Sequence, residues 1–220
     1  MNLEISNTKK HLSGTIKVTG SKSESNRLLI LQALYPNLKI SNLSNSDDTH
    51  YLRKALKSED ELVDIHHAGT AMRFLTAYFS SLEGREVVLT GSKRMTERPV
   101  KLLVDALKQM GADISYENND GYPPIRIKGK KLTANRVSFQ ANISSQYISA
   151  LMLIAPSLPN GLEINLEGEI TSSPYIKMTL EILQRAGIKG VFQGKTIKIE
   201  PTQDVEKQTL AVESFKIKHL

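Results

Sequence analysis

The sequence contains no cysteine and no tryptophan among its 220 residues. The lack of cysteine excludes disulfide bonds and thiol chemistry, and it fits a protein of a reducing compartment. No apolar run approaches the roughly 20 residues that a membrane-spanning helix needs. The segment Met1–Ile5 also lacks the charged and apolar regions of a signal peptide. We therefore expect a cytoplasmic protein that does not associate with membranes.

A large excess of one charge is also missing. The chain has 29 Lys and Arg against 23 Asp and Glu, a formal net charge of +6. Such a balance is compatible with binding nucleic acid or an anionic small molecule. The basic residues are scattered among acidic ones and no known nucleic-acid motif is present, so we expect no nucleic-acid partner. His66 and His67 are adjacent and therefore point different ways, which disfavours a metal site.

The segment Gly20–Arg27 (GSKSESNR) combines a glycine, three hydroxyls and two cations. The strand-like residues Thr15–Val18 precede it and the apolar run Leu28–Leu34 follows it. A strand, a small polar loop and a helix together direct backbone N–H groups at a phosphate. Lys22 would add a point charge and Arg27 a bidentate fork. The alternative is simple helix capping, which needs one such residue rather than three. The segment therefore predicts a site for a small phosphorylated molecule.

Strand–loop–helix units of two kinds alternate along the chain. Those with a small polar loop span 21–34, 67–82 and 142–158, and those with a longer loop span 45–56, 91–110 and 168–186. In the second kind, Pro99 and Pro174 suit the first helical position, and Gly111 and Gly187 suit the position past the end. This recurrence predicts three copies of one α/β unit with six helices, whose polar loops converge on one face. The alternative is a generic α/β domain without a repeat.

Two further loops are candidates for contacts with an anion. Gly69 opens one helix and permits close approach of a ligand, while Arg73, one turn later, suits an internal ion pair as well as a ligand. The segment Arg94–Pro99 suits a phosphate clamp or a surface salt-bridge patch equally.

Two other helix starts carry clusters of polar side chains. Ser144, Ser145 and Gln146 offer more hydrogen-bonding groups than a helix cap needs, so they fit a ligand. Asp47 and Asp48 favour the positive end of a helix, so we expect a structural role for them.

Taken together, these motifs resemble the 5-enolpyruvylshikimate-3-phosphate synthase family. The matching pieces run in family order: GSKSESNR (20–27), NSDDT (45–49), AGTAMR (68–73), LTG with RMTERP (89–99), GYPPIRIKG (121–129), SSQYISALM (144–152) and SSPYI (172–176). The resemblance implies an α/β fold with three βαβαββ repeats around a helical core, one of the family's two domains. It also implies transfer of the enolpyruvyl group of phosphoenolpyruvate to the 5-hydroxyl of shikimate 3-phosphate, without a cofactor or metal.

The resemblance also implies roles for individual residues. Lys22 would touch both substrates and be the catalytic residue, and Gln146 would reach both substrates. Gly69 and Arg98 would hold phosphoenolpyruvate. The remaining residues implied to bind shikimate 3-phosphate are Ser23, Arg27, Ser144, Ser145, Ser172 and Tyr175.

The chain departs from the family pattern in several places. His67 stands where asparagine is usual, and Phe74 replaces a proline. The region between Leu56 and His66 is about two dozen residues shorter than the repeat length predicts. We expect this to remove strands from the first unit and to leave its loops unchanged. We assign 1–214 to the N-terminal domain, with the first ~12 residues on the side of the interdomain hinge. We expect residues 215–220 to lie outside the family pattern and the second domain to be absent from this chain. We therefore expect an inactive half-enzyme unless a second domain is supplied elsewhere; the alternative is a non-catalytic module that binds shikimate 3-phosphate.

Overall fold

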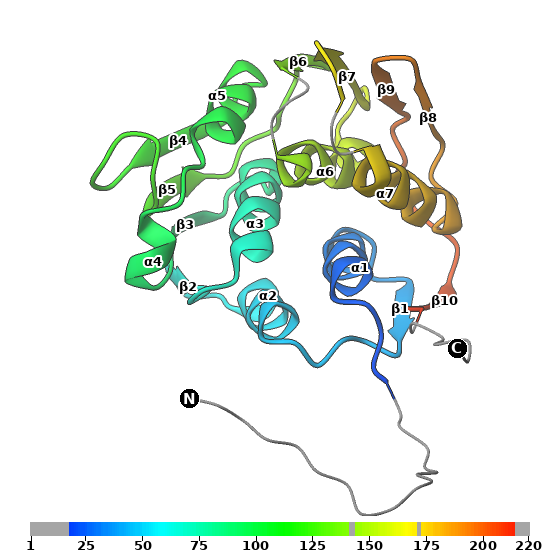
Figure 1. The fold of residues 1–220 in the computed structure, drawn as a ribbon, viewed down its shortest axis with the longest axis horizontal. Helices are drawn as coiled ribbons and strands as arrows, with labels where there is room; N and C mark the ends of the chain where they lie inside the picture. Colours follow the sequence, from blue (N-terminus) through cyan, green and yellow to red (C-terminus); the bar gives the residue numbers. More distant parts are fainter. Residues whose placement is uncertain (1–17, 141–143, 171–172, 214–220) are drawn as a thin grey trace, which may run out of the picture.

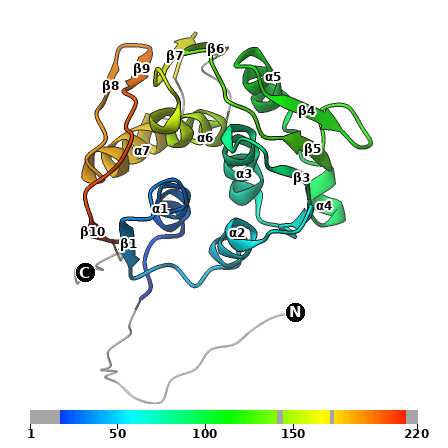
Figure 2. The same cartoon turned by 180° about the vertical axis from the view of Figure 1, so that it is seen from behind.

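The computed structural model describes residues 18–140, 144–170 and 173–213. The helices at 22–34, 69–81 and 145–154 lie in the middle and the sheets lie outside them, as Figure 1 and the reverse view in Figure 2 show. The helices are α1 (Lys22–Leu34), α2 (Asp47–Lys57), α3 (Gly69–Ser81), α4 (Lys93–Thr96), α5 (Lys101–Gln109), α6 (Ser145–Ile154) and α7 (Ser173–Arg185), with a 3₁₀ turn, η1, at Ala155–Ser157. The strands are β1 (Leu38–Ser41), β2 (Leu62–Asp64), β3 (Glu86–Thr90), β4 (Asp113–Tyr116), β5 (Ile125–Lys128), β6 (Arg136–Gln140), β7 (Leu162–Glu167), β8 (Gly190–Gln193), β9 (Thr196–Ile199) and β10 (Gln208–Ala211).

Two of the three sheets have the same topology. Their strand orders are β2-β3-β5-β4 and β6-β7-β9-β8. In each, the first two strands are parallel and the next two pairings are antiparallel. Helical structure follows each of the first two strands, which gives the βαβαββ unit twice, as the family resemblance implies.

The third unit is assembled from the two ends of the described chain. Strand β1 pairs in parallel with β10, with Leu38 opposite Gln208 and Ile40 opposite Leu210. The described strand that pairs with β1, the strand after α1, is thus β10. The predicted strand Thr15–Val18 falls almost wholly outside the described residues. Val18 is not in a strand, and residues 15–17 lie outside the described residues. Within the described ranges this sheet has two strands where the others have four, as the short region between Leu56 and His66 predicts.

The helices with small polar loops form the centre of the fold. Helices α1, α3 and α6 contact one another, and each has a long run of buried residues. The runs are Ser25–Leu31, Ala71–Ser80 and Tyr147–Ile154. A helix buried all round belongs in the core, whereas α5 buries one face through Leu103, Val104 and Leu107.

The predicted helix ends are confirmed, but one predicted helix start is wrong. Gly111 and Gly187 follow α5 and α7 with φ of +100° and +84°, a conformation that glycine adopts without steric cost. Pro174 is the second residue of α7, close to its expected place. Pro99, in contrast, lies outside α5, which begins at Lys101 after the cap residue Val100. Its carbonyl is instead bound by the side chains of Arg73 and Tyr147.

Among the described residues, no helix has the length and apolar character needed to cross a membrane.

Candidate functional site

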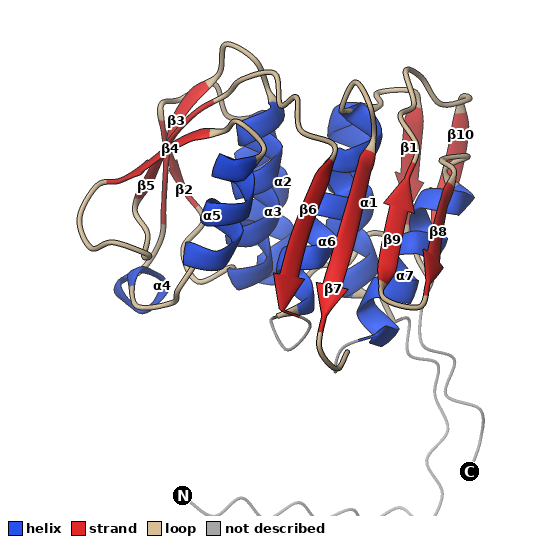
Figure 3. Ribbon diagram, turned by 90° about the horizontal axis from the view of Figure 1, so that it is seen from above, coloured by secondary structure: helices blue, strands red, loops and turns tan. Residues whose placement is uncertain are grey.

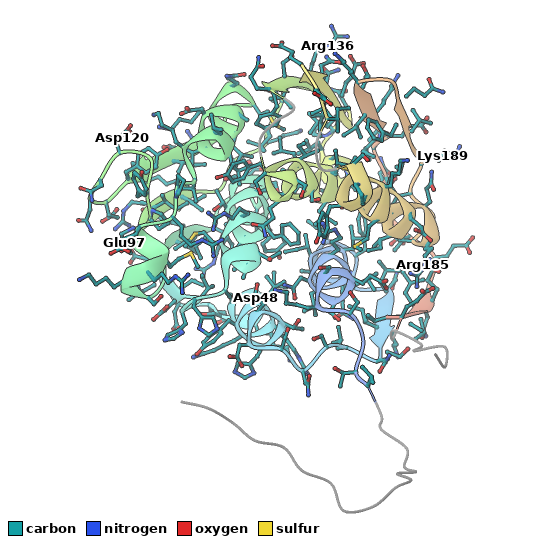
Figure 4. The ribbon with its side chains drawn as sticks, in the orientation of Figure 1. Asp48, Glu97, Asp120, Arg136, Arg185 and Lys189 are labelled. Carbon is teal, nitrogen blue, oxygen red and sulfur yellow. The ribbon has the colours of Figure 1, made fainter. Side chains whose placement is uncertain are left out.

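The starts of several helices gather at one end of the molecule. In Figure 3, β6 and β7 run in the same direction toward the edge where α4 also lies. The Gln146 amide at the start of α6 donates to Thr70 Oγ1 at 3.4 Å. Backbone N of Thr70, in turn, donates to Asp48 Oδ1 at 3.3 Å, and Figure 4 labels Asp48 near this junction of α2 and α3. Asp48 thus has the structural role that the sequence predicts.

The loop before α1 is held by residues from the far end of the chain. Ser21 caps α1 by accepting from Glu24 N, and its own backbone N donates to the Glu213 carbonyl at 3.0 Å. A Cβ at Gly20 would collide with the Asn42 carbonyl and lie 2.7 Å from Val212 Cβ. Gly20 therefore allows the split third unit to close. Lys22, the first residue of α1, is exposed, and Ser23 is half-buried.

Arg27 is the buried centre of the site, with only 3% of its surface exposed. Its guanidinium donates to Thr179 Oγ1 at 2.7 Å, to Ser149 Oγ at 3.0 Å and to the Ser23 carbonyl at 2.9 Å. Burial lowers the pKa of Arg27 to about 10, against the opposing effect of the nearby Tyr175 and Glu24. Arg27 thus connects the first turn of α1 with the middle of α6 and of α7.

Aromatic rings complete the surroundings of Arg27. Its guanidinium carbon lies 5.4 Å from the centre of the Phe74 ring and 6.0 Å from that of Tyr175. These distances are typical of cation–π contacts. Phe74 extends the contacts of Arg27 to a fourth helix, α3.

The start of α6 presents the three polar residues that the sequence singles out. Ser144 is exposed and caps the helix through a 3.3 Å hydrogen bond from Gln146 N. Ser145 is 8% exposed and Gln146 is half-buried. Tyr175, in the first turn of α7, is 48% exposed. Ser172 lies outside the described residues.

Two arginines meet at the start of α3. A Cβ at Gly69 would collide with Arg98 Nη1 and lie 2.8 Å from Arg98 Cζ, so the exposed guanidinium rests on Gly69. Arg73 is 4% exposed and donates to the carbonyls of Gly69 at 3.2 Å and Pro99 at 2.9 Å. Burial lowers the pKa of Arg73, and the charge of Arg98 lowers it further. Two like charges beside a helix N-terminus favour an anion between them.

Sequence reasoning missed the polar groups on which these arginines depend. Ser149 and Thr179 are fully buried and hydrogen-bonded to each other at 2.9 Å, and Tyr147 donates to the Pro99 carbonyl at 2.8 Å. A hydroxyl inside an otherwise apolar helix stretch is the signal that would have identified Ser149. Among the described residues, Arg73 donates to backbone carbonyls rather than to a carboxylate, and its contact with a ligand stays a prediction.

The adjacent histidines lie beside the site. His66 Nδ1 and His67 Nδ1 are 2.6 Å apart, so the prediction that these side chains point different ways is wrong. His67 Nε2 lies 3.5 Å from Asp47 Oδ2. Within the described ranges, no three His, Asp or Glu side chains are placed to hold a metal ion.

Comparisons with known proteins agree on one family. The family model of EPSP synthase (3-phosphoshikimate 1-carboxyvinyltransferase) matches residues 6–58 and 52–217. The 3-phosphoshikimate 1-carboxyvinyltransferase of Bacteroides fragilis is 47% identical over 192 residues, 86% of this chain and 47% of the relative. That of Colwellia psychrerythraea is 43% identical over 204 residues, 80% of this chain and 48% of the relative.

The fold matches solved structures as well. A 2.37 Å structure of EPSP synthase from Acinetobacter baumannii superimposes with a TM-score of 0.76 at 18% identity, over 90% of this chain and 49% of that one. The chain thus spans about half the length of the relatives it matches. On these matches, the chain belongs to the EPSP synthase family.

Proposed function

We propose that this chain carries the shikimate 3-phosphate-binding half of an enzyme that transfers the enolpyruvyl group of phosphoenolpyruvate. One observation supports this above others: Arg27 is buried between α1, α6 and α7, and it contacts Ser23 and Tyr175 in the first turns of α1 and α7. Helix starts offer unpaired N–H groups and a positive potential, so this end of the molecule suits a phosphorylated anion.

Shikimate 3-phosphate would bind across α1, α6 and α7. The serines at the start of α6 supply hydroxyls and backbone N–H groups for its phosphate. Tyr175 offers an exposed ring beside Arg27 for the carbocycle. The full proposed set is Lys22, Ser23, Arg27, Ser144, Ser145, Gln146, Ser172 and Tyr175.

Phosphoenolpyruvate would bind at the start of α3. Arg98 lies on Gly69 there, and the hydrogen bond from Gln146 to Thr70 links this place to the start of α6. Lys22 and Gln146 would contact both substrates. In the reaction, C3 of phosphoenolpyruvate gains a proton while the 5-hydroxyl loses its own proton and attacks C2. The adduct then loses phosphate from C2 and a proton from C3, which restores the C2–C3 double bond. Cations fixed around the phosphate stabilise the charge that changes in the transition state.

We further propose that residues 1–214 form the first of two domains and that turnover requires the second. The chain spans about half the length of its relatives. The resemblance implies that both substrates lie between two domains. The purified 220-residue chain should therefore bind shikimate 3-phosphate without producing phosphate or product. Synthase activity of this chain alone would contradict this part of the proposal.

Titration calorimetry with each substrate, and with both, tests the proposal. We expect saturable binding of shikimate 3-phosphate and tighter binding of phosphoenolpyruvate once that site is filled. Arg27→Ala should abolish the first binding event. Binding of shikimate 3-phosphate without any effect on phosphoenolpyruvate would favour the non-catalytic module. Absence of saturable shikimate 3-phosphate binding would refute both.

A further inference from the structure

The Pro99 carbonyl accepts hydrogen bonds from two side chains on two different helices. Arg73 Nη2, on α3, donates at 2.9 Å, and the Tyr147 hydroxyl, on α6, donates at 2.8 Å. Both side chains are buried, with 4% and 7% of their surface exposed. The backbone immediately after Arg98 is thus fixed to the helical core.

The same arginine also contacts the surface on which Arg98 rests. Arg73 Nη1 donates to the Gly69 carbonyl at 3.2 Å. One guanidinium therefore connects Gly69 to Pro99 and sets the spacing between the start of α3 and the backbone that carries Arg98. Tyr147 supplies the second bond and ties this pair to the start of α6.

Arg98 needs such support because its electrostatic surroundings are unfavourable. Its exposed guanidinium lies against the positive end of α3, and its charge lowers the pKa of the buried Arg73. These repulsions favour displacement of Arg98 into solvent before an anion arrives. A backbone held at Pro99 limits that displacement and lowers the cost of ordering Arg98 on binding.

We propose that the Tyr147 hydroxyl, acting with Arg73 on the Pro99 carbonyl, is a positioning group that fixes Arg98 for anion recognition. The identity of the anion as phosphoenolpyruvate rests on the proposed function. Tyr147 acts through the backbone of Pro99 and is distinct from the residues proposed to touch the substrates.

Tyr147→Phe removes this hydroxyl and keeps the ring. Tyr78→Phe is a matched control, because Tyr78 is also a helical tyrosine with 7% exposure. It lies nine residues after Gly69 on α3, which is about 13 Å along the helix axis. For both variants and the parent chain we would measure shikimate 3-phosphate affinity, phosphoenolpyruvate affinity with shikimate 3-phosphate saturating, and ligand-free exchange of the Arg98 amide.

The expected result separates the two substrates. Tyr147→Phe should weaken phosphoenolpyruvate binding about three- to tenfold, the equivalent of one lost hydrogen bond. It should leave shikimate 3-phosphate affinity and the Tyr78→Phe control unchanged. The Arg98 amide, which donates to the Met95 carbonyl at 3.0 Å, should exchange faster in Tyr147→Phe alone.

Two outcomes would overturn the inference: Tyr147→Phe matching the parent chain in phosphoenolpyruvate affinity and amide exchange, or Tyr78→Phe showing the same losses. If the parent chain binds neither substrate, the proposed function fails. The amide exchange of Arg98, which requires no ligand, then decides whether Tyr147 fixes this backbone.

Discussion

Gly69 shows how one missing side chain shapes the candidate site. It is the first residue of α3, where an alanine backbone would be unstrained. The space that a Cβ would fill is taken by the Arg98 guanidinium. A family motif thus has a local physical reason, which is to let a cation approach the start of a helix.

Gly69→Ala should displace Arg98 and leave the fold intact, because the colliding group is the end of a flexible, exposed side chain. We expect phosphoenolpyruvate affinity to fall at least about tenfold, the cost of a lost charge-assisted hydrogen bond. Calorimetry should show shikimate 3-phosphate affinity within about twofold of the parent chain. Unchanged phosphoenolpyruvate affinity would mean that Arg98 does not act from this position.

Tyr35 gives a prediction for stability at high pH. Its hydroxyl donates to the Thr202 carbonyl at 2.9 Å, and burial, with help from Asp204, raises its pKa to about 12. The unfolded chain releases this proton near pH 10, so the folded state binds more protons between pH 10 and 12. The stabilisation present below pH 10 is therefore lost as the pH rises to 12.

Urea denaturation across that range should show the effect. Between pH 10 and pH 12, the free energy of unfolding of Tyr35→Phe should fall by about 2 kcal/mol less than that of the parent chain. The pKa of Tyr116 is also raised to about 12, which makes the free energy of unfolding fall as the pH rises, and the lowered pKa of Arg27 makes it rise. Both contributions are the same in the two proteins, so they do not affect the comparison. Equal slopes for the two proteins would show that Tyr35 does not titrate in this way.

At the scale of elements, periodicity and loop chemistry are sufficient to predict the repeat. The apolar runs after small polar loops predict α1, α3 and α6, and the glycines past α5 and α7 mark their ends. The pairing of β1 with β10 is beyond such reasoning, because the partners are 170 residues apart and the pairing depends on the closure of the whole fold. The position of Pro99 follows from Arg73 and Tyr147, whose contacts are likewise distant in sequence.

Gly20→Ala tests that closure. The added Cβ would collide with the Asn42 carbonyl and with Val212, which lie on the two sides of the split unit. Because one colliding group is backbone, we expect a loss of about 1–3 kcal/mol in the free energy of unfolding, typical of an overpacked site. Amide exchange should rise first in β1 and β10. A neutral substitution would show that this junction tolerates expansion.

At the scale of the whole molecule, three related units bring their loops to one end. The sequence predicts most of the proposed ligand residues at helix starts. In the structure, Arg27 contacts Ser23 and Tyr175, and Arg73 contacts Gly69. The sequence alone could not predict that Arg27 and Arg73 are buried and bonded to hydroxyls or carbonyls, because many of those partners come from other helices. The site is therefore a property of the assembled units and of no single motif.

The most direct test is a titration of the isotope-labelled 220-residue chain with shikimate 3-phosphate, followed by amide NMR. The account predicts saturable shifts at Ser23, Ser145, Gln146 and Tyr175, which lie at the starts of three helices. Shifts at the opposite ends of these helices, or none that saturate, would contradict it.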